Sequence, residues 1–335
     1  MRFTLSALAG AAGMALMAMQ PAHAECGRIT IADMNWASAE FAAYIDKFIL
    51  AEGYGCDVEL VPGDTMPTST SMMEKGKPDI APELWINAVR TALDKAVDDG
   101  RLLYAAEILK DGGEEGWWIP SYVADAHPEI QTVADAFKRP DLFKHPEDDD
   151  KGAFFGCPAG WNCQITNGNL FRANGGEEAG FELVDPGSAA GLDGSIAKAY
   201  ERKQPWFGYY WAPTSILGKY PMKKLDFGVP HDKAHWDSCT VKEDCGEAKR
   251  NAWPKSEVYT VVTPNFARSS PTGMAYIEKR GWSNVVANEV LAYMADNQYT
   301  GEEGAIYFLK KYEDLWSEWV SPEAAGKIKA ALANS

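Results

Sequence analysis

The chain has 335 residues, with 48 acidic and 32 basic side chains and a formal net charge of −16 at neutral pH. This length exceeds what one hydrophobic core usually organises, so we expect two lobes. The acidity argues against nucleic acid and anionic lipid surfaces as partners.

The N-terminus predicts export. Arg2 is followed by an apolar run at 3–19 and by Ala22-His23-Ala24, which has the small residues of a signal-peptidase site. We therefore interpret 1–24 as a signal peptide cleaved after about Ala24 and expect a periplasmic mature protein. No later run reaches the roughly 18 apolar residues of a membrane-spanning helix.

Strand-like and helix-like segments alternate from the start of the mature chain. Short apolar runs predict strands at 28–32, 57–61 and 80–85. Apolar residues at helical spacing predict a helix capped by Ser38 that ends before Gly53, and further helices at 68–75 and 88–97. This β-α-β-α-β order favours a parallel sheet with right-handed crossovers.

The alternation pauses near Gly112-Gly113 and then resumes as a second α/β unit. We expect strands at 153–157, 181–184 and 207–211, and helices at 133–137, 163–173 and 196–202. Extended pieces follow at 223–227 and 258–262, and helices close the chain at 285–294, 305–316 and 323–332. The polar stretch 231–254 looks like an irregular excursion rather than a domain.

These segments predict an α/β protein of two lobes joined by a hinge, with a ligand cleft between the lobes. The expected boundaries are 25–115 for the first part of lobe 1, 116–222 for lobe 2, and 223–335 for the completion of lobe 1 and the C-terminal helices. Ligands of open α/β sheets bind beyond the carboxyl ends of the strands, so residues at those ends are candidates.

Six cysteines in an exported chain indicate disulfides. The equal spacings of Cys157-x5-Cys163 and Cys239-x5-Cys245 suit local loops, which leaves Cys26 to pair with Cys56. Six cysteines allow fifteen pairings, so spacing favours this connectivity without proving it. A lipoprotein acylated at Cys26 is an alternative, although Ala24-Glu25 makes a poor lipobox.

An exported metal-binding protein is a further alternative. His231 and His235 lie just upstream of Cys239 and Cys245, and 148–150 is an acidic tract. An oxidising compartment and the lack of any CxxC pair argue against zinc, so we expect no metal site.

Twelve tryptophans are an unusually large number for this length. Four of them follow or end expected strands, two in each expected lobe: Trp36, Trp85, Trp161 and Trp211. Closing the lobes would bring the four together. Indole faces carry a negative quadrupole potential, so such a cluster suits a quaternary ammonium ion, which offers no hydrogen bonds. Core packing is the commoner role for any single tryptophan, and we assign it to Trp282, Trp316 and Trp319.

A betaine also needs a partner for its carboxylate. Trp161-Asn162-Cys163 opens an expected helix, whose free backbone N–H groups favour an anion. A Cys157–Cys163 bridge would hold this turn rigid. Glu115 is a candidate for contacting the cation or a ligand hydrogen-bond donor, although a plain surface charge is the commoner role of a glutamate.

The chain resembles the substrate-binding proteins of glycine betaine/proline betaine/choline-type ABC transporters over essentially the whole mature sequence. The matching segments are Asn35-Trp36, Glu83-Leu84-Trp85, Gly156-Cys157-Pro158-Ala159-Gly160-Trp161-Asn162-Cys163 and Tyr209-Tyr210-Trp211-Ala212-Pro213. The resemblance implies a two-lobed, type II-like periplasmic-binding-protein fold that closes on a small methylated ammonium ligand and delivers it to a membrane permease. It also implies that the four tryptophans line an ammonium box. In some members, backbone amides matching Asn162 and Cys163 hold the carboxylate.

Val89 is a departure from that family. Certain betaine binders place a histidine four residues after the tryptophan that matches Trp85, where this chain has Val89. The segment Glu114-Glu115-Gly116-Trp117-Trp118 resembles a subgroup that includes trimethylamine N-oxide binders, in which a glutamate can face the ligand oxygen. Val89 weakens the case for a carboxylate ligand and admits choline or trimethylamine N-oxide. We still expect glycine betaine, with trimethylamine N-oxide, choline and proline betaine as close alternatives.

Enzyme motifs are absent from the sequence: it contains no G-x-S-x-G, P-loop, G-x-G-x-x-G or HExxH pattern. We therefore expect no catalytic activity and no cofactor. The expected partners are the small ligand and the permease, and the expected oligomeric state is a monomer.

Overall fold

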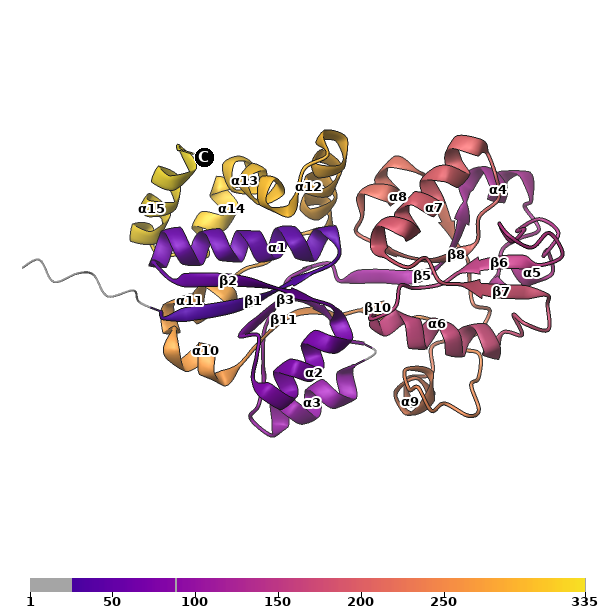
Figure 1. Cartoon of the computed structure of the whole chain (residues 1–335), viewed down its shortest axis with the longest axis horizontal. Helices are drawn as coiled ribbons and strands as arrows, with labels where there is room; N and C mark the ends of the chain where they lie inside the picture. Colours follow the sequence, from indigo (N-terminus) through magenta and orange to yellow (C-terminus); the bar gives the residue numbers. More distant parts are fainter. Residues whose placement is uncertain (1–25, 88, 335) are drawn as a thin grey trace, which may run out of the picture.

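The computed structural model describes residues 26–87 and 89–334, which form two lobes built around separate sheets (Figure 1). Among these residues, 26–87, 89–112 and 257–334 form the first lobe, and 113–256 form the second lobe. The expected signal peptide lies outside the described residues. A mixed α/β protein of two lobes is therefore confirmed.

The first-lobe sheet joins strands from both ends of the chain. Its order is β2-β1-β3-β11-β4, in which β1 pairs in parallel with β2 and β3, whereas β11 runs antiparallel between β3 and β4. The strands are β1 (Arg28–Met34), β2 (Asp57–Gly63), β3 (Ile80–Trp85), β4 (Leu103–Glu107) and β11 (Val258–Val262). The chain therefore leaves the first lobe after β4, forms the whole second lobe, and returns to complete the first-lobe sheet with β11.

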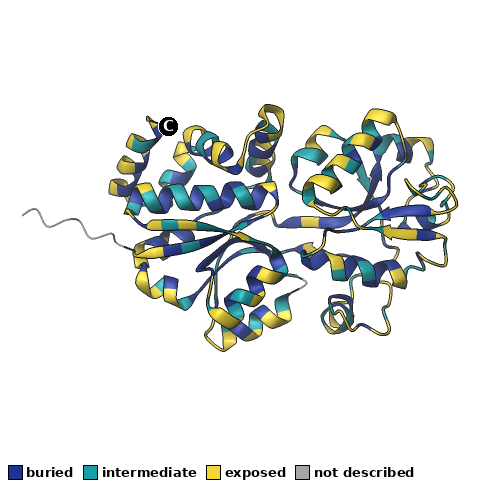
Figure 2. Ribbon diagram, viewed as in Figure 1, coloured by how far each residue is buried: buried dark blue, intermediate teal, exposed yellow. Residues whose placement is uncertain are grey.

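Helices cover both faces of this sheet. Figure 1 shows α1 and the C-terminal helices α12 to α15 on one face and α2 and α3 on the other. The helices of this lobe are α1 (Ala37–Phe48), continued by the π-turn η1 (Ile49–Gly53), α2 (Thr65–Lys75), α3 (Arg90–Asp98), α10 (Pro264–Ser269), α11 (Pro271–Ile277), α12 (Asn284–Asn297), α13 (Gly301–Lys311), α14 (Glu313–Ser317) and α15 (Pro322–Leu332). Every residue of β3 is buried, as expected for a central strand covered on both faces (Figure 2).

The second-lobe sheet has the order β10-β5-β8-β6-β7, and β9 pairs with another part of β5. Its strands are β5 (Gly113–Pro120), β6 (Gly152–Phe155), β7 (Phe181–Val184), β8 (Gly208–Ala212), β9 (Met222–Lys224) and β10 (Lys255–Ser256). Its helices are α4 (Ser121–Ala126), α5 (Val133–Phe137), α6 (Asn162–Ala173), α7 (Ala189–Arg202), α8 (Ser215–Lys219), α9 (Lys233–His235) and the π-turn η2 (Trp236–Thr240). Among the described helices, none combines the length and apolarity needed to cross a lipid bilayer.

Two expectations about the fold are wrong. The chain returns to the first lobe near Glu257, not at 223, because β9 and β10 both pair with β5 in the second sheet. Ser38 does not cap α1: the N-cap residue is Trp36, and Ser38 lies inside the helix, where its hydroxyl donates to the Glu83 carboxylate. Ser38 was expected to cap the helix because of its local propensity, but its side chain forms a tertiary hydrogen bond instead.

The three expected disulfides are present. Cys26–Cys56 ties the start of β1 to the start of β2, and Cys157–Cys163 joins the end of β6 to the first turn of α6. Cys239–Cys245 closes the excursion that follows β9. Each bridge thus fixes a loop at the end of a strand or helix.

Candidate functional site

A cavity of about 290 Å³ lies where the two lobes meet. Its lining comes from the first lobe (Trp36, Thr65 and Trp85) and from the second (Glu115, Trp161, Asn162, Cys163, Tyr209 and Trp211). All seven candidate residues from the sequence are in this set. The structure therefore brings together side chains that lie far apart along the chain.

The fold places the four tryptophans at the ends of strands. Trp36 follows β1 as the N-cap residue of α1, and Trp85 is the last residue of β3. Trp161 is the N-cap residue of α6, and Trp211 lies next to the end of β8. Each of these tryptophans is at most 7% exposed. Strand ends that face the other lobe thus supply four nearly buried indoles to one space.

The indole planes of the cavity meet at steep angles. The ring centroids of Trp36 and Trp161 are 5.5 Å apart with planes at 70°, and those of Trp161 and Trp211 are 5.0 Å apart at 80°. Both pairs have the edge-to-face geometry that aromatic quadrupoles favour. Tyr209 lies nearly parallel to Trp211, with centroids 6.2 Å apart and an angle of 22°. The rings therefore wall the cavity from different directions.

Hydrogen bonds fix three of the four indoles. The N–H groups of Trp36 and Trp85 donate to Oε1 of Glu83 at 2.8 and 3.0 Å. The N–H group of Trp161 donates across the lobe boundary to Oδ1 of Asn35 at 2.7 Å. Because these bonds anchor the edges of the rings, the ring orientations are held.

Residues 160–162 make the contacts that join the lobes at this site. The Asn162 side-chain amide donates to the main-chain oxygen of Trp85 at 2.7 Å, and the N–H of Met66 donates to the carbonyl of Gly160 at 3.3 Å. Gly160 has a φ of 89°, and a Cβ there would stand 2.9 Å from a carboxylate oxygen of Asp64. The positive φ therefore favours glycine at this point of contact between the lobes.

Glu115 is the carboxylate that lines the cavity. It lies on β5, is 4% exposed, and accepts hydrogen bonds from the hydroxyls of Tyr209 (2.7 Å) and Ser256. Burial raises the pKa of Glu115, and the two hydroxyls together with the charge of Lys224 oppose this shift. The expectation that Glu115 is more commonly a surface charge is therefore wrong for this site.

The first turn of α6 is the second polar feature of the cavity. Asn162 and Cys163 line the space, and no side chain from the described part of the chain caps this helix end. Helix N-termini carry unsatisfied N–H groups and a positive dipole end, which favour an anion. Together, the cavity offers aromatic faces, an anion-favouring helix end and one buried carboxylate.

Comparison with known proteins identifies the family of this chain. The family model for the substrate-binding domain of ABC-type glycine betaine transport systems matches residues 27–311. The chain belongs to this family. Its members are substrate-binding transport proteins, and the match covers both lobes and every residue that lines the cavity.

Solved structures of similar fold include a glycine betaine/L-proline-binding protein (ProX) from Borrelia burgdorferi, with 18% identity, a TM-score of 0.70, and coverage of 90% of this chain and 99% of that one. The closed lactococcal OpuAC complexed with glycine betaine has 16% identity and a TM-score of 0.66, over 88% of this chain and 100% of that one. An ABC-transporter choline-binding protein in complex with choline has 18% identity and a TM-score of 0.68, over 93% and 100%. At these identities, the likeness establishes the two-lobed periplasmic-binding-protein fold.

Within this family fold, Val89 is not one of the residues that line the cavity. It is the N-cap residue of α3 and is 8% exposed. The position where certain betaine binders carry a histidine therefore supplies no polar contact here.

Other aromatic residues of this family member pack beside or beneath the site. Trp117 is fully buried in the second-lobe core, and its N–H donates to Asn167, whereas Trp118 donates to the carbonyl of Tyr210. Trp253 contacts Tyr209, with centroids 5.6 Å apart, so the excursion after β9 supports the cavity wall. The core assignment of the tryptophans near the C-terminus is confirmed, since all are buried: Trp282, Trp316 and Trp319.

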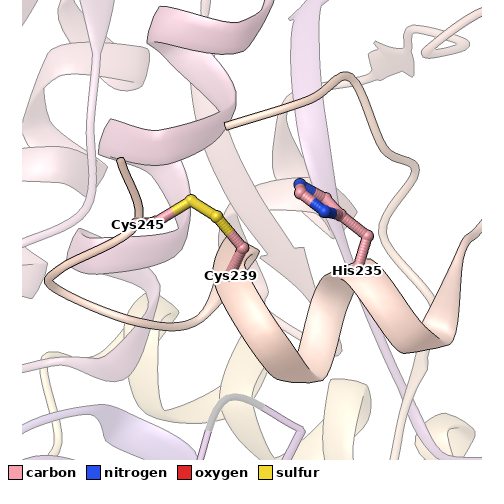
Figure 3. A group of neighbouring side chains, drawn as sticks. All are labelled: His235, Cys239 and Cys245. Carbon is pink, nitrogen blue, oxygen red and sulfur yellow. A yellow bond between two sulfur atoms is a disulfide. The ribbon is translucent and has the colours of Figure 1, made fainter. Parts of the chain in front are cut away.

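The alternative of a metal site finds no support. In the described part of the chain, the group of possible ligands is His235 with Cys239 and Cys245, and the two sulfurs are bonded to each other (Figure 3). Nε2 of His235 accepts a hydrogen bond from the main-chain N–H of Lys249, and Nδ1 of His231 bonds to the Ala252 carbonyl. A disulfide offers no thiolates to zinc, so this cluster has a structural role.

Two lining residues were not expected from the sequence. Tyr209 precedes Trp211 by two positions in β8, so the two-residue period of a strand places both on one face and would have identified it. Thr65 is the first residue of α2, directly after β2, and carries neither charge nor an aromatic ring. Only its position at a strand-to-helix junction could have suggested it.

Proposed function

We propose that this chain is the periplasmic, monomeric solute-binding component of an ABC importer and captures a methylated ammonium compound. Glycine betaine is the first choice, with trimethylamine N-oxide, choline and proline betaine as close alternatives. The observation that carries the proposal is that four nearly buried tryptophans from two lobes line one small cavity.

The cation is the part of the ligand that the four tryptophans suit. A quaternary ammonium group is bulky, weakly hydrated and unable to donate hydrogen bonds, so it gains from aromatic faces by about 0.5–2 kcal/mol for each desolvated face. The cavity is small, and four of its nine lining residues are tryptophans. A compact methylated amine fits such a space better than a sugar or a peptide.

The polar features suit the other end of the ligand. N–H groups in the first turn of α6 would hold a carboxylate, and the Cys157–Cys163 bridge limits the cost of ordering that turn. Glu115 has a raised pKa, and in its neutral form it can donate a hydrogen bond to a ligand oxygen. An ionised Glu115 would instead accept a hydrogen bond from the hydroxyl of choline.

Transport follows from closure of the lobes. The open protein admits the ligand, and contacts made from both lobes then stabilise the closed form. The permease then recognises and binds the closed, ligand-bound form. Residues 160–162 form hydrogen bonds to the first lobe, so these bonds can exist only in the closed form.

The test is a calorimetric titration of the mature protein with glycine betaine, proline betaine, choline and trimethylamine N-oxide, with maltose as the control. We expect at least one methylated amine to bind and maltose not to bind. If every methylated amine fails at millimolar concentration, the proposal is wrong.

Glu115→Gln extends this test to the oxygen end of the ligand. Glutamine is neutral and keeps a donor, so affinity for a ligand with a carboxylate or N-oxide should be retained, whereas affinity for choline should fall. Retained affinity for choline together with lost affinity for a carboxylate or N-oxide ligand would contradict both roles, because neither the charge nor an amide-replaceable donor would then account for the contact.

A further inference from the structure

Glu83 is a buried carboxylate that lies one layer behind the cavity. It is in β3, is 0% exposed, and does not itself line the space. Its Oε1 accepts hydrogen bonds from the indole N–H groups of Trp36 and Trp85, at 2.8 and 3.0 Å, and from the hydroxyl of Ser38 at 2.8 Å. A single oxygen atom therefore holds both first-lobe tryptophans of the cavity.

The other carboxylate oxygen of Glu83 is not satisfied. Oε2 is buried and receives no hydrogen bond from the residues that the structure describes. Buried polar atoms in native proteins nearly always have a partner, so an exception needs an explanation. The three donors on Oε1 favour an ionised carboxylate, and an ionised carboxylate has charge left to compensate.

The buried cation near Glu83 is already paired. Arg280 forms an ion pair with Asp46, with 2.8 Å between Nε and Oδ1 and 2.9 Å between Nη2 and Oδ2. Burial raises the pKa of Glu83, and the three hydrogen-bond donors and, least of all, the charge of Arg280 oppose this shift. Because Asp46 offsets Arg280, Glu83 is the carboxylate of this buried trio that lacks a counter-ion of its own.

We propose that Glu83 is ionised in the ligand-bound protein and is the counter-charge of the tryptophan cavity. It acts as a positioning residue, because it fixes two indoles by their N–H edges and strengthens the attraction of their faces for a quaternary ammonium ion. The inference rests on the proposed function and adds the residue that selects for positive charge.

The physical basis is electrostatic. An anion bonded to the indole N–H increases the electron density of the ring, and a cation at the ring face feels both the quadrupole and the full charge behind it. The rings and Glu83 are nearly or fully buried, so salt and water screen this attraction little. A neutral ligand of the same shape would gain only from packing.

The test separates charge from shape. Glu83→Gln keeps an acceptor oxygen for the indole N–H groups and removes the charge. We expect calorimetry to show at least tenfold weaker binding of choline and glycine betaine. We expect an unchanged or higher Tm, since the cost of burying an unpaired charge is removed. Binding of 3,3-dimethylbutan-1-ol, the uncharged isostere of choline, should not weaken.

Ser38→Ala is the matched control, because it removes one donor to the same oxygen and keeps the charge. We expect less than a threefold change in affinity. Wild-type affinity in Glu83→Gln overturns the inference, as does a loss of affinity matched by Ser38→Ala or accompanied by a lower Tm. If the wild type binds no methylated amine, the proposed function fails as well.

A second measurement does not depend on the folding of Glu83→Gln. In Glu115→Gln protein with carbon-13-labelled glutamate and saturated with choline at neutral pH, we expect no infrared band of a protonated glutamic acid. Exposed glutamates are ionised under these conditions, so a surviving band would report a neutral Glu83 and overturn the inference.

Discussion

The two halves of the cavity are held in different ways. In the first lobe, the N–H groups of Trp36 and Trp85 both bond to Glu83 of the same lobe. In the second lobe, the N–H group of Trp161 bonds to Asn35 of the opposite lobe. The first-lobe half is therefore organised by its own lobe, whereas the second-lobe half reaches its final geometry only when the lobes meet.

This difference indicates an order of events. A ligand that meets the first lobe finds two indoles already oriented, so little ordering cost remains for that contact. The second lobe then adds Trp161 and Trp211, and the cross-lobe hydrogen bonds stabilise the closed form. Side chains of the first half should therefore govern recognition, and those of the second half should govern both recognition and closure.

Trp161→Ala is expected to have the largest effect. Trp161 packs edge-to-face against Trp36 and Trp211 and bonds to Asn35, so its loss removes a cation–π face and two aromatic pairs. These contributions add to about 3 kcal/mol, which is roughly hundredfold in affinity. Titration calorimetry of the mature protein measures it.

Trp206→Phe is the control for that variant. Trp206 is a buried second-lobe tryptophan that stacks on Phe155 and does not line the cavity. The ligand affinity of the Trp206→Phe protein should therefore match that of the wild type. A Trp161→Ala protein that binds as well as Trp206→Phe would show that Trp161 contributes nothing to ligand binding.

Trp85→Ala and Trp211→Ala compare one face from each half. Each should weaken binding tenfold or more, because losing one desolvated face costs about 1.4 kcal/mol or greater. If the first-lobe half governs recognition, the loss in Trp85→Ala should appear in the association rate as well as in the dissociation rate. Unchanged affinity in both variants would mean that these residues serve only as core.

Asn35→Ala tests closure by itself, because Asn35 bonds to Trp161 without lining the cavity. Losing a hydrogen bond of about 1 kcal/mol should raise the dissociation rate roughly fivefold, with little change in association. Stopped-flow tryptophan fluorescence measures both rates. Asn297→Ala, which loses a bond within one lobe, is the control and should leave both rates unchanged.

Asp193→Asn is expected to have the smallest effect on ligand affinity, and it acts on stability instead. Asp193 lies with Trp36, Trp211 and Leu291 around a second cavity between the lobes and accepts a hydrogen bond from the Tyr210 hydroxyl. Burial raises its pKa from 3.8 to about 6. The folded protein therefore binds this proton more strongly than the unfolded chain, and ionisation costs stability as the pH rises from about 4 to about 6.

The variant removes that cost, so its Tm should exceed that of the wild type above about pH 6. The difference should shrink as the pH falls toward about 4. A Tm difference that does not change over this window would contradict the raised pKa of Asp193.

Local patterns predicted most of the secondary structure and missed what depends on distant pairing. The expected strands at 80–85, 181–184 and 258–262 and the helix at 133–137 match the structure in both ends. The strands β4 and β5 were not expected, because Gly112-Gly113 and the mixed sequence around them carry no clear period. Their strand conformation comes from pairing with β11 and β8.

The candidate site was predictable because strand ends in α/β folds face the ligand. That rule places Trp36, Trp85, Trp161 and Trp211 together without knowledge of the structure. Glu83 could not be assigned in this way, since a carboxylate in an apolar strand gives no indication of which donors will surround it. The partners of Glu83 come from 45 and 47 residues away as well as from Trp85 of the same strand.

The sequence by itself determined the fold class and the positions of the four tryptophans at strand ends, and it favoured the three cysteine pairs that the structure contains. Each depends on periodicity, spacing or residue type, which are local properties. Only the tertiary structure decided that the second lobe extends to Ser256 and that Ser38 donates to Glu83 instead of capping the helix. It also decided which half of the cavity is oriented by hydrogen bonds within its own lobe. These outcomes arise from hydrogen bonds and strand pairings between distant segments, whose energies no local pattern contains.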